Sequence, residues 1–96
     1  MAVYMLFMRE APVRDAAELA IYNEMNRAAP RDPKLKPLAV YGAVEALEGD
    51  APDGVILLEF PTLEDARAWY DSPAYQAALP HRQKGADYRA MIIQGL

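Results

Sequence analysis

Cysteine is absent from this 96-residue chain, and histidine occurs only once. Without cysteine the chain can form no disulfide, no thiolate nucleophile and no cysteine-ligated zinc or iron–sulfur site. A single histidine cannot supply a histidine pair at metal-ligand spacing, and the sequence carries no phosphate loop, dinucleotide-binding fingerprint or Gly-x-Ser-x-Gly elbow. We therefore expect neither a metal site nor a cofactor.

Basic charge is scarce as well. The chain has 10 Lys and Arg residues against 14 Asp and Glu residues, which gives a net charge of −4. This charge repels nucleic acid and anionic lipid, so we expect neither as a partner. The apolar segment 2–8 (AVYMLFM) is too short to span a membrane and lacks the flanks of a signal peptide. A cytoplasmic location is the resulting expectation.

Linkers, low-complexity runs and internal repeats are also lacking, so residues 1–96 are expected to form a single domain. A chain of this length buries only about 60–65% of its unfolded surface when it folds alone. Hydrophobic residues nevertheless make up 53% of the sequence. Some of this apolar material is therefore expected to lie in a subunit interface.

The order of the expected elements predicts the fold. Hydrophobic spacing, capping residues and turn residues predict strands at 2–9, 38–47, 55–60 and 88–94, and helices at 15–30, 62–70 and 73–85. The first helix should bury Ala17, Ile21, Met25 and Ala28. A β-α-β-β-α-β order is typical of the ferredoxin-like α+β fold, with a four-stranded antiparallel sheet and helices on one face.

The expected sheet is apolar on both faces. In the first strand Val3, Met5 and Phe7 alternate with Tyr4, Leu6 and Met8, which are apolar or aromatic too, whereas a strand with one wet face alternates apolar with polar residues. The helices cover only one face, and a bare apolar sheet invites aggregation. We therefore predict a homodimer in which the second face packs against the sheet of an identical copy.

Three segments carry a family resemblance. Residues 42–49 (GAVEALEG), 58–61 (LEFP) and above all 66–76 (ARAWYDSPAYQ) resemble a bacterial family known as domain of unknown function 1330, and the last strand ending at Gly95 fits it as well. The resemblance extends in order over nearly the whole chain. Two segments depart from the expected pattern, namely the proline-rich loop 30–37 and the start of the first helix at 13–15.

This resemblance implies the dimeric α+β barrel superfamily, in agreement with the argument from the strands. Relatives in that superfamily include cofactor-free monooxygenases, muconolactone-type isomerases, haem proteins and stress-induced proteins of no known activity. The fold therefore does not select a function. The resemblance also favours Arg82 over His81 as the family-typical position.

Glu59 is the first candidate site residue, because it lies in an otherwise apolar strand on the same face as Val55 and Leu57. A carboxylate in such a place is expected to be paired or raised in pKa. One interpretation is an ion pair with an arginine (Arg9, Arg82 or Arg89) or a position at a frayed strand end. The other is an acid or base in a pocket between the sheet and the helices.

His81 and Arg82 form the second candidate site, near the end of the third helix. A lone histidine without an evident nucleophile is most often solvated. If it is catalytic, His81 or Glu59 would move protons while Arg82 holds an anionic oxygen, as in a cofactor-independent isomerase or monooxygenase. That hypothesis requires His81, Arg82 and Glu59 to surround one concave site.

An aromatic cluster is the third candidate. Trp69, Tyr70 and Tyr75 flank the break between the second and third helices, and aromatic residues at helical spacing are most often core. Their N–H and O–H groups need partners, so the same cluster is also suited to line a small-molecule cavity. The candidate ligand contacts are then Tyr41, Glu59, Trp69, Tyr70, Tyr75 and Arg82. A dimer that binds a small organic molecule is thus our first hypothesis, an enzyme the second, and a structural or interaction module the third.

Overall fold

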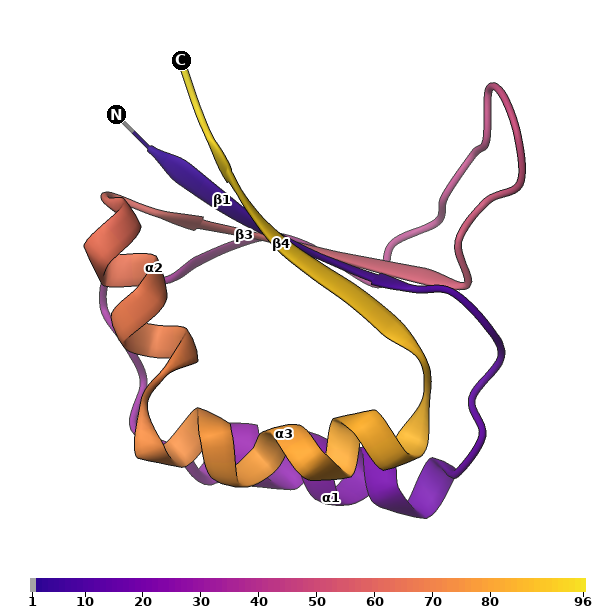
Figure 1. The fold of residues 1–96 in the computed structure, drawn as a ribbon, viewed down its shortest axis with the longest axis horizontal. Coiled ribbons are helices and arrows are strands. Elements are labelled where there is room, and N and C mark those ends of the chain that lie inside the picture. The colour runs from indigo at the N-terminus through magenta and orange to yellow at the C-terminus, as the bar shows by residue number, and fades with distance from the viewer. Residues whose placement is uncertain (1) are drawn as a thin grey trace.

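The expected element order is confirmed in the computed structural model, which describes residues 2–96. The elements are β1 (Val3–Arg9), α1 (Ala16–Ala28), β2 (Lys36–Val40), β3 (Gly54–Phe60), α2 (Leu63–Tyr70), α3 (Pro73–Gly85) and β4 (Tyr88–Gln94). The second crossover carries two helices, α2 and α3, and all three helices lie on the same side of the sheet (Figure 1). No helix within residues 2–96 has the length and apolar character needed to cross a membrane.

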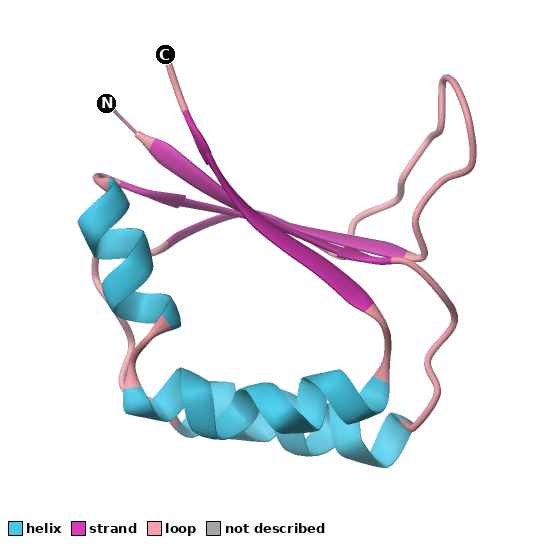
Figure 2. Cartoon of the chain, in the orientation of Figure 1, coloured by secondary structure: helices cyan, strands magenta, loops and turns pink. Residues whose placement is uncertain are grey.

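The sheet is four-stranded and antiparallel, in the order β2-β3-β1-β4 (Figure 2). Central strand β1 pairs with β3 and β4 along its whole length, so that Met5 lies between Leu58 and Ile92. Edge strand β2 pairs only with β3 and is bulged between Pro37 and Ala39. This order and these directions are those of the ferredoxin-like fold.

The second strand is shorter than predicted. A strand over 38–47 was expected, but β2 ends at Val40. The chain leaves the extended conformation at Tyr41, whose φ of 53° lies in the left-handed region. Residues 41–53 then form an irregular arm that rises on the side of the sheet away from α1 and α3 (Figure 1). Leu47 on this arm is 89% exposed.

Side-chain caps begin all three helices at the predicted residues. Asp15 Oδ1 accepts hydrogen bonds from the backbone N–H of Ala17 and Glu18 at 3.1 and 3.3 Å. Thr62 Oγ1 and Ser72 Oγ accept in the same way from the third residue after each, at 3.1 and 3.2 Å. Each cap satisfies backbone donors that the first helical turn leaves free.

The buried face of α1 differs from the predicted one. Ile21 is 42% exposed, whereas Tyr22 is 8% exposed. The reason is that α1 packs against α3 rather than on the sheet, so a second helix, and not the strands, selects its buried face. The two helices approach closely at Gly85, where an added Cβ atom would lie 2.5 Å from Leu19 Cγ.

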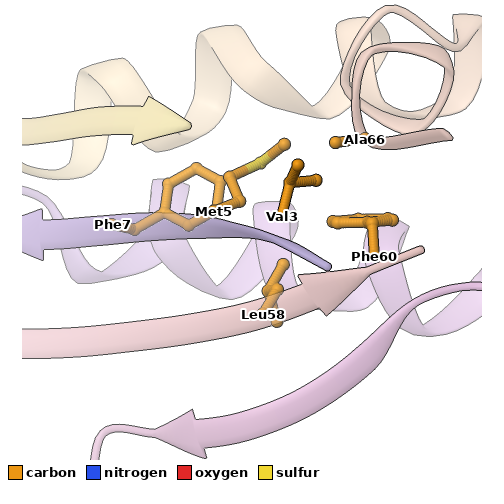
Figure 3. Packing of buried hydrophobic residues seen from close by; sticks show 6 residues of the cluster. All are labelled: Val3, Met5, Phe7, Leu58, Phe60 and Ala66. Carbon is orange, nitrogen blue, oxygen red and sulfur yellow. The ribbon is translucent and has the colours of Figure 1, made fainter. Parts of the chain in front are cut away.

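The hydrophobic core lies between α2 and the helix-facing side of β1 and β3 (Figure 3). Alternate residues of the paired strands face this side, because the register sets Val3 opposite Phe60 and Met5 opposite Leu58. Phe60 and Met5 are 0% and 1% exposed. The cluster comprises Val3, Met5, Phe7, Leu58, Phe60 and Ala66.

The opposite side of the sheet is the second apolar face predicted from the sequence. We call it the outer face: Tyr4, Leu6, Met8, Val55, Leu57, Met91 and Ile93. Neighbouring strands half-bury most of these side chains, while Ile93 is 55% exposed. None of the helices described in residues 2–96 lies over this face (Figure 1).

We predict that Phe60→Ala lowers the free energy of unfolding by about 3–5 kcal/mol, because it leaves a cavity at a fully buried position. Chemical denaturation measures the change. Gln83→Ala, at an exposed position of α3, is the matched control and should alter stability by less than about 0.5 kcal/mol. A loss below about 1 kcal/mol in Phe60→Ala would contradict this description of the core.

Candidate functional site

A cavity of about 490 Å³ lies between the helix-facing side of the sheet and the α1/α3 layer. Its volume falls within the range of small-molecule sites, roughly 300–1,000 Å³. The sheet supplies Phe7, Ile56 and Leu58, and the helical layer supplies Tyr22, Trp69 and Tyr75. Residues of α1, β2 and the loop between them form its rim: Asn23, Asn26, Arg27, Pro30, Arg31, Asp32, Leu35, Pro37, Val40 and Tyr41.

Aromatic rings form one continuous wall of this cavity. The ring centroids of Trp69 and Tyr75 lie 4.4 Å apart, and the ring of Phe7 meets that of Trp69 edge-on at 6.5 Å. Such contacts add stability beyond the area they bury. Tyr70 stacks on the far side of Tyr75 at 5.3 Å and does not line the cavity. Of the predicted ligand contacts, the structure therefore brings Tyr41, Trp69 and Tyr75 to the wall.

Two pairs of tyrosine hydroxyls border the same space. The hydroxyl oxygens of Tyr22 and Tyr75 lie 2.8 Å apart, and those of Tyr41 and Tyr88 lie 2.7 Å apart. Burial raises the pKa of Tyr22, Tyr41 and Tyr75 above the usual tyrosine value. These phenols therefore stay protonated at neutral pH and act as hydrogen-bond donors rather than bases.

Tyr41 reaches its partner through an unusual backbone conformation. A left-handed φ costs a non-glycine residue about 1–2 kcal/mol, and Tyr41 adopts one at 53°. Its ring lies so close to Gly54 that an added Cβ atom there would be 2.8 Å from Tyr41 Cδ1. The guanidinium of Arg9 lies over the other part of the ring, 5.0 Å from its centroid. Neighbouring residues thus hold Tyr41 in a conformation that points its hydroxyl at Tyr88.

Arg82 is the one charged residue buried within residues 2–96, at 6% exposure. Its guanidinium lies between two rings, 5.3 Å from the centroid of Phe7 and 5.0 Å from that of Tyr88. Nε and Nη1 are buried and form no hydrogen bond with any described residue. Arg82 does not itself line the cavity, contrary to the prediction from the sequence, but it contacts the ring of Phe7, which does.

Glu59 does not face this cavity, so the predicted acid or base in a pocket is wrong, and so is the predicted ion pair with an arginine. It lies on the outer face, opposite Tyr4 on β1 and Lys36 on β2, because the residues on either side of it, Leu58 and Phe60, point toward the helices. The arginines named as its partners are engaged elsewhere. Arg9 pairs with Asp53, Arg89 pairs with Glu10, and Arg82 lies on the opposite side of the sheet.

His81 is held between two helices and is not freely solvated. Its Nδ1 lies 2.6 Å from Glu18 Oε2, and this contact joins α3 to α1. The side chain is 29% exposed and lies outside the cavity lining. Glu59, His81 and Arg82 therefore do not surround one concave site, and the geometry that the enzymatic hypothesis required is not present.

Three residues of the site escaped the sequence analysis: Phe7, Tyr22 and Tyr88. The sequence placed Phe7 on one face of the first strand with Val3 and Met5, and nothing in a strand of apolar residues separates a core position from a cavity position. Tyr22 follows Ile21, which was taken for the buried residue. Tyr22 is three residues before Met25, which the sequence placed on the buried face. This spacing could have indicated that Tyr22 is buried too, since residues three apart share a helix face.

No group of metal-ligating side chains occurs among residues 2–96.

Solved structures support the fold assignment. A protein of unknown function from Rhodopseudomonas palustris, RPA0582, aligns with a TM-score of 0.69 at 20% identity, covering 99% of this chain and 82% of that one. A dimeric ferredoxin-like protein of unknown function from Thermobifida fusca aligns at 0.63 and 19% identity, covering 99% and 92%. A dimeric protein of ferredoxin-like fold from Bacteroides fragilis aligns at 0.61 and 16% identity, covering 98% and 96%.

Among proteins of curated function, none matches the sequence. The family comparison is specific, and it agrees with the resemblance noted in residues 42–49, 58–61 and 66–76. Its match extends over nearly the full length, from residue 2 to residue 96, and shows that the chain belongs to the family described as Domain of unknown function (DUF1330).

Proposed function

We propose that this protein is a homodimer that binds a small, largely apolar organic molecule in the cavity between its sheet and its helices. The observation that carries the proposal is the aromatic-walled cavity of about 490 Å³ formed by Phe7, Tyr22, Trp69 and Tyr75. A space of this size lined by rings with a few polar groups is typical of small-molecule sites. Packing alone would not leave it open, because protein interiors are close-packed.

Binding is favoured over catalysis by the chemistry of the groups around the cavity. The tyrosine hydroxyls are protonated donors, and the nearby charge of Arg82 is a guanidinium, which remains protonated in proteins. The carboxylate at the rim is that of Asp32. It accepts a hydrogen bond from the backbone N–H of Lys34. Such a set orients and holds a molecule, whereas proton abstraction needs a base with a pKa near the working pH.

Self-association is supported by the outer face and the arm. Seven apolar or aromatic side chains of β1, β3 and β4 face away from the helices, and contiguous apolar patches on a sheet are expected to be covered. The arm over residues 41–53 rises on that same side and exposes Val44 and Leu47 (Figure 1). The structural neighbours from Thermobifida fusca and Bacteroides fragilis are described as dimeric. A second copy packed face to face covers both surfaces at once.

We predict that Leu6→Asp converts the dimer to a monomer. Leu6 lies at the centre of the outer face between Leu57 and Met91, and burial of an unpaired carboxylate there is strongly unfavourable. Light scattering coupled to gel filtration at micromolar concentration measures the mass. Ala20→Asp on the exposed side of α1 is the matched control and should remain dimeric. A wild-type mass of 10.7 kDa under these conditions would refute the dimer.

We also predict that Ala74→Trp weakens binding in the cavity. Ala74 is exposed yet lines the cavity, so an indole there occupies ligand space without disturbing the core. Benzamide, a neutral aromatic probe, should bind the wild type and lose about tenfold or more in affinity in the variant, as expected for loss of an apolar subsite. Isothermal titration measures both affinities.

Ala77→Trp provides the control for this experiment, since Ala77 is exposed on the same helix but does not line the cavity. Its affinity for benzamide should equal that of the wild type. Equal weakening in both variants, or no affinity of the wild type for benzamide or for any other small aromatic probe, would contradict the proposed binding site.

A further inference from the structure

The buried guanidinium of Arg82 is a charge without a counterion. Arg82 is 6% exposed, and its Nε and Nη1 atoms form no hydrogen bond with any residue in the described range 2–96. A buried charge is normally paired, and buried donors are normally satisfied. The rings of Phe7 and Tyr88 compensate only in part, because they attract the charge but accept none of its N–H groups in a hydrogen bond.

The hydroxyl pairs add donors beside this charge. Tyr75 and Tyr22 share one hydrogen bond, as do Tyr41 and Tyr88. Two hydroxyls that share one hydrogen bond use one of their two protons, so each pair retains a proton for another acceptor. Arg82 contacts the ring of Tyr88 directly. Its charge also acts to lower the pKa of Tyr22 and Tyr75, which therefore lie near it. Hydrogen-bond donors therefore gather beside the cavity, although Arg82 and Tyr88 are not among its lining residues.

Charged residues also lie at the rim of the cavity. Arg27 and Arg31 line the cavity mouth against a single carboxylate, Asp32. Arg27 is paired with Glu24, whereas none of the ion pairs within residues 2–96 includes Arg31. With Glu24 counted, two arginines stand with two carboxylates, so the rim carries no net charge.

We infer that the ligand of this cavity is a small aromatic monocarboxylate whose carboxylate lies at the end of the cavity nearest Arg82, beside the free hydroxyl protons, and whose ring packs on Trp69 and Tyr75. This inference rests on the proposed function and specifies its ligand. A single buried guanidinium balances a single negative charge, which favours a carboxylate over a phosphate dianion. The ring is required by the walls, because Phe7, Trp69 and Tyr75 offer apolar and aromatic surface to the body of the ligand.

The inference is tested with benzoate and benzamide, which have nearly the same shape but differ in charge. Isothermal titration of the wild type should show benzoate binding at least about tenfold more tightly than benzamide. Arg82→Met should weaken benzoate by about 10- to 100-fold, as expected for loss of a buried opposite charge. The same variant should leave benzamide nearly unchanged. Arg67→Met, on the exposed side of α2, is the matched control and should preserve both affinities.

Thermal unfolding of Arg82→Met separates a ligand anchor from a structural residue. A buried charge without a partner opposes folding, so its replacement by an apolar side chain of similar length should preserve or raise the melting temperature. A large fall would indicate that the ring contacts make Arg82 a structural residue. In that case Arg82→Lys decides the question, because it keeps the charge but not the shape of the donor group. It should weaken benzoate selectively, and equal weakening of both probes would overturn the inference.

The two proposals fail in different ways. If the wild type binds benzamide as tightly as benzoate, or if Arg82→Met keeps the preference for benzoate, the cavity binds small molecules but not through an anion at Arg82. If phenyl phosphate binds more tightly than benzoate, the anion is a phosphate and the carboxylate assignment is wrong. If none of the three probes binds, the proposed function itself fails.

Discussion

The guanidinium of Arg82 lies between the ring of Phe7 on β1 and the ring of Tyr88 on β4, and much of the molecule is arranged around it. α3 carries this side chain and packs on α1 rather than on the strands, so both helices remain separated from the sheet. Side chains from both layers occupy the space between them, and the aromatic wall and hydroxyl pairs all lie there.

The energetics of this arrangement are unfavourable for the protein alone. Transfer of a charge from water into a protein interior costs several kcal/mol even after relaxation. Two cation–π contacts return about 0.5–2 kcal/mol each. The left-handed backbone at Tyr41 adds a cost of about 1–2 kcal/mol on the same side of the sheet. Local features that lower stability and lie together are characteristic of functional sites, because a protein under selection for stability alone would replace them.

Much of the fold was predictable from the sequence because local signals agreed with one another. Asp15, Thr62 and Ser72 begin helices where their caps predicted, and the strands of β1, β3 and β4 lie within a residue or two of the predicted ones. The predicted end of β2 and the predicted buried face of α1 were wrong, because contacts between distant parts of the chain determine both. β2 ends early because Tyr41 turns the backbone toward Gly54 and Tyr88, a contact between residues far apart in the sequence. Ile21 is exposed because α1 packs against a helix and not against the sheet.

The error at Glu59 has a different origin, and it explains why the candidate site could be predicted only in part. Strand alternation correctly groups Glu59 with Val55 and Leu57, but it does not say which group the helices cover when both groups are apolar. That choice depends on the direction of the crossovers, which bring α2 onto Phe60 and Phe7. The aromatic residues of the second crossover could therefore be placed near a cavity from sequence alone, because they belong to the covering helices. A carboxylate on the sheet could not, and Glu59 lies on the outer face. A ligand carboxylate near Arg82, as inferred above, would bring a negative charge that the described residues do not place beside this guanidinium.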